Sequence, residues 1–356
     1  MFDLESFRNI NLPSENDIME SWSSHVNTPV ISIICTSYNQ ERYISDALRG
    51  FLIQKTTVPF EVVIHDDAST DNTREIIEYY AELYPAIIKP IFQVRNQYSI
   101  DGHLPFYNAI KNSLGEFVSL CEGDDFWICS DKLEKQYQLM LSNPDIDLCF
   151  TSALLMKNEV VSGIAANYTN SYKFFSVCNV IEKGGSFIPT ASVFLRKKVL
   201  DVSFFSVIKD APVGDYYLQI FGALNSGVIL QGYPCSVYRV DAIDSWSANV
   251  RASDSLIKIE NFVNGNEKTL LKILQNNSHL EESIKYAISN FYLSASKRAF
   301  KLGLIAESKA YLDKVSFRYN RSEINNIFFY CLCKTLPVKV IYFFMSLLRR
   351  VYDIQL

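Results

Sequence analysis

Short apolar runs alternate with helical stretches through the first 121 residues, and this alternation constrains the fold more than any other feature. Each run is short enough to be a buried strand, and the stretches between them have helical periodicity. The expected strands are 30–36, 60–65, 87–94 and 116–121, and the expected helices are 41–53, 71–83 and 104–113. The pattern predicts an α/β fold with a mostly parallel sheet flanked by helices.

Polar side chains follow the carboxyl end of each expected strand. They occur at Thr36–Asn39, Asp66–Asp67, Arg95–Asn96 and Asp124–Asp125. Ligands of open α/β sheets bind at this edge, so the four clusters predict a binding site there. Two adjacent aspartates repel each other, and a solvated turn is the alternative interpretation of Asp124–Asp125 taken alone.

The rest of the chain divides into a continued α/β region and a helical region. Residues 157–185 are rich in Asn, Ser and Gly and are expected to be loops. The other expected elements are helices over 131–142 and 215–224 and strands over 148–156, 186–197 and 227–237. The expected parts are a loosely structured lead-in (1–28), an α/β domain (29–250) and a helical C-terminal region (251–356).

Composition excludes several classes of protein. The net charge of −5 argues against a general nucleic-acid binder, which needs a basic surface along the phosphates. The eight scattered cysteines are expected to be reduced core residues of a cytosolic protein. We expect no signal peptide and no membrane span. A dinucleotide-binding enzyme is disfavoured because no GxGxxG follows the first strand.

Three motifs, in order and at domain-like spacing, resemble those of family 2 glycosyltransferases with the GT-A (Rossmann-like) fold. They are Val30–Asn39, Val62–Thr73 and Gly115–Asp125, and the resemblance covers roughly residues 29–247. The Glu-Gly-Asp-Asp-Phe-Trp form, followed by Asp131-Lys-Leu133, is similar to bacterial enzymes that build O-antigen and capsule repeat units.

The resemblance implies a nucleotide-sugar donor at the aspartate pair. Asp125 is expected to bind Mg²⁺ or Mn²⁺, which bridges the diphosphate, and Asp124 to hold the ribose or the sugar. Such cations usually take one or two protein carboxylates plus phosphate oxygens. The cation would remove the repulsion between the two aspartates and neutralise the departing diphosphate.

The resemblance also implies residues that read the base. Asp67 is expected to accept the N3–H of uracil, with Thr36 and Tyr38 flanking the ring and Asn39 beside them. Arg95 stands where the family often places an arginine near the base or diphosphate. Helix capping by Asp67, strand-end packing of Thr36 and Tyr38, and an unengaged surface position for Arg95 remain the alternatives.

Asp215, in Val213–Leu218, is the best match to the family's acceptor-activating base. Gly214 replaces the usual glutamate, which is a departure from the family pattern. An N-cap role is the alternative for Asp215, and Asp201 and Asp210 are its nearest competitors.

The segments around the expected base are similar to the acceptor side of the family. Thr190 and Ser192 are expected to bond acceptor hydroxyls, although strand-edge structure would explain them equally well. Arg239 and Trp246 lie in segments that resemble the part of the family that closes over the diphosphate. Arg239 is expected to pair with phosphate, and Trp246 to contact the acceptor.

The predicted function is an inverting, metal-dependent transfer of a hexose, with glucose or galactose favoured, from a UDP-sugar. The expected acceptor is a hydroxyl of a saccharide on a lipid diphosphate, most simply undecaprenyl diphosphate, in surface polysaccharide synthesis. A non-catalytic GT-A module that binds sugar nucleotide or scaffolds an assembly is the alternative, and a receiver-like phosphoacceptor is disfavoured by chain length.

The apolar stretch 338–352 with its basic flanks bears on location. It is too short to span a bilayer, and it suits either a membrane interface or a core or dimer helix. With a lipid-linked acceptor, it predicts a cytoplasmic protein held peripherally at the inner face of the cytoplasmic membrane.

Overall fold

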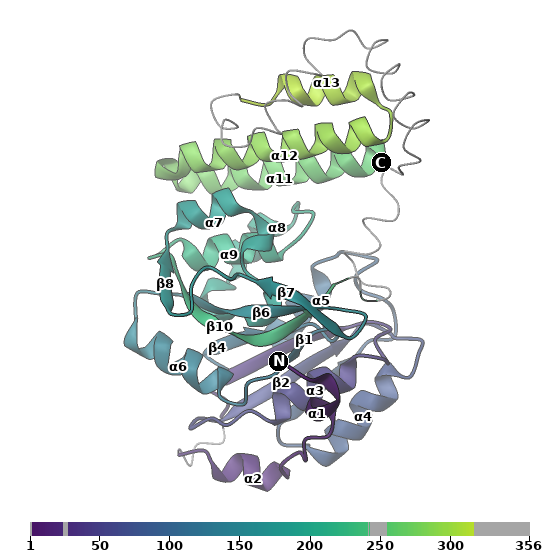
Figure 1. The fold of residues 1–356 in the computed structure, drawn as a ribbon, viewed down its shortest axis with the longest axis vertical. Coiled ribbons are helices and arrows are strands. Elements are labelled where there is room, and N and C mark those ends of the chain that lie inside the picture. The colour runs from purple at the N-terminus through teal and green to yellow at the C-terminus, as the bar shows by residue number, and fades with distance from the viewer. Residues whose placement is uncertain (1, 24–27, 241, 243–254, 317–356) are drawn as a thin grey trace. The chain divides into compact units, whose positions relative to one another are not determined.

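A computed structural model describes residues 2–23, 28–240, 242 and 255–316 (Figure 1). Trp246 and the apolar stretch 338–352 lie outside the described residues. The chain divides into two compact units, residues 1–206 with 213–248 and residues 207–212 with 249–356. Helix α8 (Val202–Ile208) contains the point at which the chain passes from the first unit to the second.

The first unit is built on a parallel array that confirms the expected strands. The strands are β1 (Ile31–Ser37), β2 (Phe60–Asp66), β3 (Ile88–Phe92) and β4 (Phe117–Leu120). They pair in the order β3-β2-β1-β4, and every pair in this array is parallel. Because β1 and β2 are buried on both faces, they read in the sequence as continuous apolar runs.

The helices that connect these strands confirm the expected crossovers. They are α3 (Ile44–Leu52), α4 (Thr73–Leu83) and α5 (Leu104–Asn112). Parallel neighbours require such crossovers because a tight turn can join only antiparallel strands. Each helix therefore begins just beyond the carboxyl end of a strand, and the loops between them carry the polar residues noted in the sequence.

The second half of the sheet is mixed. It contains β5 (Phe126–Trp127), β6 (Leu148–Lys157), β9 (Phe194–Arg196) and β10 (Val228–Arg239). The sheet of the described residues has ten strands, and eight of them run in the order β3-β2-β1-β4-β9-β6-β10-β5. The other two pair outside this order. Strand β9 pairs antiparallel with β4 and β6, so it joins the two halves. Helices α6 (Lys132–Ser142) and α9 (Asp215–Ala223) confirm the sequence expectation.

Residues 157–197 correct the sequence expectation. The expected loop contains β7 (Val160–Ala165), β8 (Tyr172–Phe175) and α7 (Val177–Lys183). Strand β7 pairs with β6 and β8 with β10, and their side chains stay largely exposed, so no buried apolar run marks them. The expected strand over 186–197 is mostly 3₁₀ turns, and only β9 is extended.

The N-terminal segment is more ordered than the expected lead-in. It forms α1 (Leu4–Arg8), which Asp3 caps, and α2 (Glu15–Glu20), which Ser14 caps with a reciprocal bond from Asp17. Leu4 and Phe7 pack in a cluster with residues of β5, β6 and β10. Helix α1 is therefore attached to the strands that lead to the predicted site.

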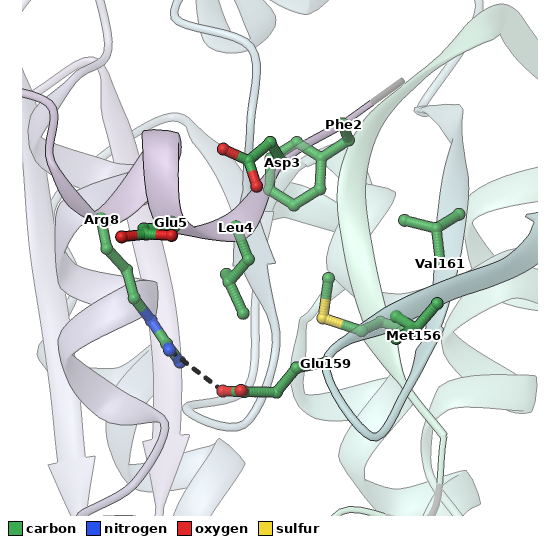
Figure 2. Close-up of a pocket in the computed structure, with 9 residues that line it drawn as sticks. Phe2, Asp3, Leu4, Glu5, Arg8, Met156, Glu159 and Val161 are labelled. Carbon is green, nitrogen blue, oxygen red and sulfur yellow. Dashed lines mark hydrogen bonds and ion pairs between the residues drawn. The ribbon is translucent and has the colours of Figure 1, made fainter.

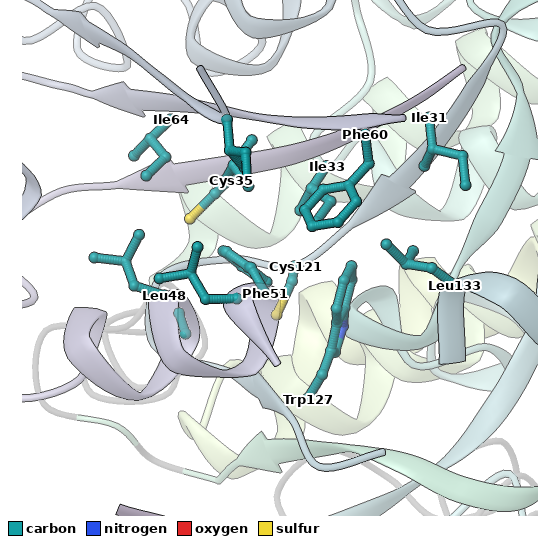
Figure 3. Packing of buried hydrophobic residues seen from close by; sticks show 14 of the residues in the cluster. Ile31, Ile33, Cys35, Leu48, Phe51, Phe60, Ile64, Cys121, Trp127 and Leu133 are labelled. Carbon is teal, nitrogen blue, oxygen red and sulfur yellow. The ribbon is translucent and has the colours of Figure 1, made fainter. Parts of the chain in front are cut away.

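One hydrophobic cluster holds α3, α4 and α6 against the sheet (Figure 3). Phe51 of α3 meets Trp127 edge to face, with ring centroids 5.0 Å apart. Both rings are fully buried, and burial of each contributes roughly 2–3 kcal/mol. Gly50 is required here, because a Cβ at this position would lie 2.7 Å from the backbone of Trp127.

The second unit is helical, as the sequence predicts. It contains α11 (Leu256–Asn276), α12 (Glu281–Lys301) and α13 (Ile305–Asp313), which share a hydrophobic cluster. The buried hydroxyls of Ser296 and Ser308 lie 2.9 Å apart and join α12 to α13. Within the described residues, no helix is both long and apolar enough to cross a membrane.

Candidate active site

The loop after β1 is bound to the loop after β2. Asn39 has a positive φ of 52°, and its Oδ1 accepts the N–H of Thr70 at 2.8 Å, while its own N–H donates to Ser69 Oγ at 2.9 Å. Its side chain therefore fixes the backbone of this edge. Thr36 is half-buried and Tyr38 is 43% exposed, so both remain accessible to a ligand.

Asp67 fastens the loop after β3. Its side chain is buried, and Oδ1 and Oδ2 accept the backbone N–H groups of Gln97 (2.6 Å) and Tyr98 (2.9 Å). Each carboxylate oxygen has a further lone pair that can accept another hydrogen bond. The contact with uracil is therefore compatible with these bonds, and it stays a prediction. Arg95 is exposed in the same loop, and its proposed contact with the donor is also untested.

The aspartate pair follows β4, and its two members differ in environment. Asp124 is half-buried, whereas Asp125 is 1% exposed. Oδ1 of Asp125 accepts the main-chain N–H of Arg239 at 2.8 Å, and Oδ2 is buried without a partner among the described residues. The turn is tied to β1 because the N–H of Gly123 donates to the carbonyl of Thr36 at 3.0 Å.

Glu122, to which the sequence analysis gave no role, belongs to the same cluster. It is open to solvent on one side, yet dense surroundings and then the charges of Asp124 and Asp215 raise its pKa to about 8. Burial also raises the pKa of Asp124, which the charge of Arg239 opposes. Burial and then the neighbouring Asp124 raise the pKa of Asp125 well above the ordinary value. An acidic cluster of this kind favours a bound cation.

Asp215 begins α9 and stands beside Thr190. Its Oδ1 accepts the N–H of Tyr216 at 2.9 Å, and its Oδ2 accepts the hydroxyl of Thr190 at 3.4 Å. Its charge also contributes to the raised pKa of Glu122. The pKa of Asp215 is itself raised, first by its dense surroundings, although its side chain keeps solvent access.

The competitors for the role of base are engaged elsewhere. Asp201 accepts the N–H of Phe204 at 2.9 Å, near the start of α8. Asp210 pairs with Lys268 at 3.1 Å and Lys272 at 2.7 Å in the second unit, and these bonds lower its pKa.

Two other predicted residues have contacts that differ from their expected roles. Ser192 is fully buried, and its hydroxyl donates to the carbonyl of Pro189 at 2.6 Å, so its position gives no support to a contact with the acceptor. Arg239 is 6% exposed, and its guanidinium bonds to Asp46 and to the main chain of Asp124. Its predicted pairing with phosphate stays a prediction, but these contacts favour a different task.

The carboxylate oxygens of the aspartate pair fit a hard divalent cation that takes few protein ligands. Among the described residues, no group of three or more His, Cys, Asp or Glu side chains could hold a metal. The unpartnered buried Oδ2 of Asp125 and the carboxylate of Asp124 offer oxygen donors. This matches the usual site for Mg²⁺ in which one or two carboxylates are supplemented by substrate phosphates.

The fold and this acidic edge define a GT-A-like protein, with a mixed, partly parallel sheet and carboxylates at the strand ends. Residues 32–204 match glycosyl transferase family 2, in agreement with the resemblance seen in the sequence.

Relatives include an uncharacterized protein of Mycobacterium tuberculosis strain H37Rv, 33% identical over 216 residues. The match spans 61% of this chain and 60% of that protein. Another relative is WfgD of Escherichia coli, a UDP-Glc:α-D-GlcNAc-diphosphoundecaprenol β-1,3-glucosyltransferase. It is 28% identical over 214 residues, which cover 59% of this chain and 77% of WfgD.

Solved structures share the fold at low sequence identity. The TarS fragment 1–349 of S. aureus, in complex with UDP-GlcNAc, has a TM-score of 0.63 and 17% identity, and the match covers 87% of each chain. The mannosyltransferase PcManGT of Pyrobaculum calidifontis, in complex with GDP-Man and Mn²⁺, has a TM-score of 0.51 and 13% identity. That match covers 98% of this chain and 92% of PcManGT.

Proposed function

We propose that this protein is an inverting glycosyltransferase that moves a hexose from a UDP-sugar to a hydroxyl of a lipid-diphosphate-linked saccharide during polysaccharide synthesis. The observation that carries the proposal is the buried Asp125 beside Asp124 in the turn after β4, with Oδ2 of Asp125 unpartnered among the described residues. Carboxylates in this turn suit a cation that binds the donor diphosphate, and Asp215 supplies the base for one direct displacement.

Asp215 takes the role of base in this proposal. The acceptor oxygen attacks the anomeric carbon as the bond from that carbon to the UDP oxygen breaks, and the acceptor proton passes to Asp215. Thr190 holds one oxygen of Asp215 in place. Asp125, with Asp124, would hold Mg²⁺ or Mn²⁺, which supplies charge neutralisation for the departing diphosphate.

The identity of the donor is supported by relatives. WfgD is named for UDP-glucose, and TarS has been solved with UDP-GlcNAc, so a UDP-sugar is the shared feature. We propose glucose or galactose as the hexose. Tyr38, exposed at the end of β1, is the aromatic side chain available to stack on the base.

The acceptor and the location follow from the same relative. WfgD acts on a saccharide linked to diphosphoundecaprenol, as its name states. A lipid-linked acceptor of this chemistry would bring the protein to the inner face of the cytoplasmic membrane as a peripheral protein.

The test is release of UDP from a panel of UDP-sugars, with Mn²⁺ and a synthetic GlcNAc-diphosphate-lipid acceptor. Asp215→Asn should lower kcat by about 10²–10⁴-fold while UDP binding is retained, because the base is lost and the donor site is not. The acid limb of the wild-type profile should lie above the ordinary aspartate pKa of 3.8, since the base is active only when ionised and its pKa is raised.

Asp145→Asn is the matched control, because Asp145 is exposed in the turn before β6 and should leave the rate unchanged. Full activity of Asp215→Asn would refute the assignment of the base. Binding of UDP without turnover of any donor would favour the alternative, a sugar-nucleotide-binding or scaffold module.

A further inference from the structure

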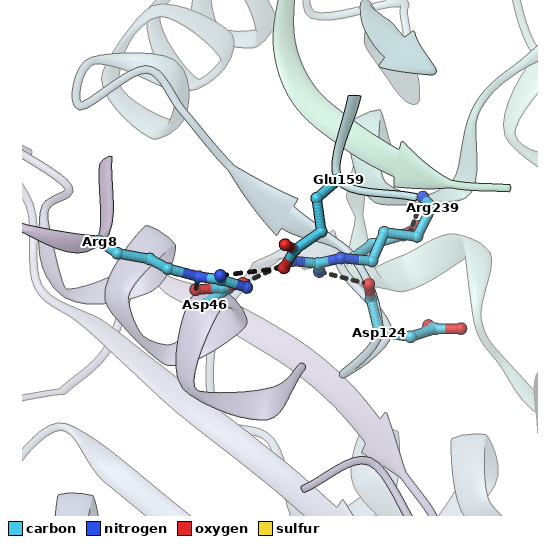
Figure 4. Close-up of polar contacts among 6 residues, drawn as sticks. Arg8, Asp46, Asp124, Glu159 and Arg239 are labelled. Atoms are coloured by element: carbon cyan, nitrogen blue, oxygen red, sulfur yellow. Dashed lines mark hydrogen bonds and ion pairs between the residues drawn. The ribbon is translucent and has the colours of Figure 1, made fainter. Parts of the chain in front are cut away.

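A chain of charged side chains, Arg8, Asp46 and Arg239, leads to the turn that carries the aspartate pair (Figure 4). Asp46 of α3 is 3% exposed and lies between two arginines. Its Oδ1 accepts from Arg8 Nε at 2.9 Å, and its Oδ2 accepts from Arg8 Nη2 at 2.8 Å and from Arg239 Nη2 at 2.5 Å. We call these three residues the Arg8–Asp46–Arg239 network.

Arg239 connects this network to both members of the aspartate pair. Its Nη1 donates to the main-chain carbonyl of Asp124 at 2.6 Å, and its main-chain N–H donates to Oδ1 of Asp125 at 2.8 Å. The guanidinium also lies over the ring of Phe126, 4.4 Å from its centroid. Both Nη atoms are therefore engaged within the protein, and the side chain is almost fully buried.

These contacts leave the carboxylate of Asp124 and Oδ2 of Asp125 available as oxygen donors. Because Arg239 occupies Oδ1 of Asp125 and fixes the carbonyl of Asp124, the backbone of the turn has little freedom to rotate. Oδ2 of Asp125 is buried and has no partner among the described residues. Hydrogen-bonded supports of this kind orient ligand groups at metal sites, and they act through the ligand without touching the metal.

The network opens to solvent at its other end. The side chain of Arg8 is 39% exposed, and its Nη1 bonds to the exposed Glu159 at 3.0 Å. Figure 2 shows this bond beside a pocket of about 470 Å³ that α1 and the β6–β7 hairpin line. Solvent screens the outer charges more than the inner ones, so the influence of the network should fall from Arg239 and Asp46 to Arg8.

We infer that Asp46 and Arg239 are positioning residues for the metal and diphosphate of the donor. Asp46 holds the guanidinium of Arg239, and Arg239 holds the Asp124–Asp125 turn with Oδ2 of Asp125 directed to the ligand. Arg8 extends this support to helix α1. The inference rests on the proposed function, because it takes the aspartate pair as the donor site.

The test is calorimetric binding of UDP with and without Mn²⁺ to the full chain, beside steady-state KM and kcat. Asp46→Asn and Arg239→Gln should each weaken Mn²⁺-dependent UDP binding by about 10–100-fold, the range found for supports of metal ligands. The donor KM should rise with the binding loss, and the acceptor KM should not change. Arg8→Gln should have a smaller effect, and Arg74→Gln, which removes an exposed arginine paired with Glu78, should have none.

The double variant Asp46→Asn/Arg239→Gln separates positioning from stability. It leaves no unpaired buried charge between these two positions, so its melting temperature should recover relative to the single variants. Its Mn²⁺-dependent binding should stay weak, because the guanidinium that holds the turn is absent. Recovery of both properties, or wild-type binding by folded single variants, would overturn the inference.

Failure of the proposed function gives a different result. Wild-type protein that binds no UDP with Mn²⁺ would remove the donor site itself, and the inference would fall with it. If the wild type binds UDP with Mn²⁺ and the variants bind it equally well, only the positioning role would be overturned.

Discussion

Lys132 lies fully buried with no carboxylate partner among the described residues, and it makes the stability of this protein depend on pH. Its Nζ donates to Gln136 Oε1 at 2.7 Å and to Ser119 Oγ at 3.0 Å, and it lies 4.0 Å from the centroid of the Trp127 ring. Burial, partly opposed by nearby cysteines, lowers its pKa from 10.5 to about 8. The folded protein therefore releases this proton at a lower pH than the unfolded chain.

Between pH 8 and 10.5 the unfolded chain binds more protons at this residue, so the free energy of unfolding should gain a contribution that rises with pH. The gain is at most roughly 3 kcal/mol. Urea unfolding of the wild type and of Lys132→Met across this pH range measures the contribution as the difference between the two slopes of the free energy of unfolding against pH. The comparison also cancels the titration of tyrosines and cysteines, which both proteins share. Lys135→Met, one turn away and exposed, should keep most of the wild-type slope; parallel curves for wild type and Lys132→Met would contradict the prediction.

At the scale of elements, the close contact between α3 and β5 depends on Gly50. Alanine normally stabilises a helix interior relative to glycine by about 1 kcal/mol. Here the added Cβ would lie 2.7 Å from the backbone N and O of Trp127, so either strand or helix must move. Gly50→Ala should therefore lower the free energy of unfolding by about 1–3 kcal/mol, measured by chemical denaturation.

Gly163→Ala in β7 is the matched control for this contact. Its new Cβ would meet only Leu155 Cδ1, at an ordinary 3.6 Å, so the change should stay within about 0.5 kcal/mol. A stabilising Gly50→Ala would show that α3 can move away from β5 without loss of packing.

Helices and strands with buried faces could be predicted from the sequence. Strands that depend only on main-chain bonds to a neighbouring strand could not. Strands β1, β2 and β4 are largely apolar because both faces are covered, and α3 and α4 show helical periodicity. Strands β7 and β8 are held by main-chain bonds to β6 and β10 while their side chains remain in solvent. Polar composition therefore made them resemble loops.

The same distinction applies to the candidate site. Asp67, Asp124, Asp125 and Asp215 could be selected because they follow strands or begin a helix in recognisable motifs. Asp46 could not, because nothing in its local sequence indicates that two arginines, 38 and 193 positions away, would converge on it. Glu122 lies in the Gly115–Asp125 motif, where nothing in the sequence marks it as a site residue. Only the interaction of its charge with that of Asp215 in the folded chain assigns it to the site.

At the scale of the whole molecule, the helical unit should lose structure independently of the sheet. The hydroxyls of Ser296 and Ser308 each donate to the other residue's carbonyl, at 2.8 and 2.9 Å, in the buried contact between α12 and α13. Ser296→Ala leaves buried polar groups without partners, which costs about 1–3 kcal/mol. Hydrogen exchange should accelerate in α12 and α13 while the amides of β1 and β2 keep their protection.

The double variant Ser296→Ala/Ser308→Ala is the control for this prediction. It should cost less than the sum of the two single changes, because the two hydroxyls are in contact at 2.9 Å and the loss of one already alters the surroundings of the other. Uniform acceleration of exchange across both units would instead show that the chain unfolds as one cooperative body.

The bond between Asp46 and Arg239 also has a consequence for how relatives diverge. It joins residues 193 positions apart; loss of Asp46 would leave the buried guanidinium of Arg239 without its carboxylate partner, and loss of Arg239 would leave the buried Asp46 paired with Arg8 alone. Substitutions at the two positions should therefore be inherited together: descendants that lose one charge should also have lost the other. Position 8 contacts the same carboxylate but is partly exposed, so its arginine should drift more freely among lineages.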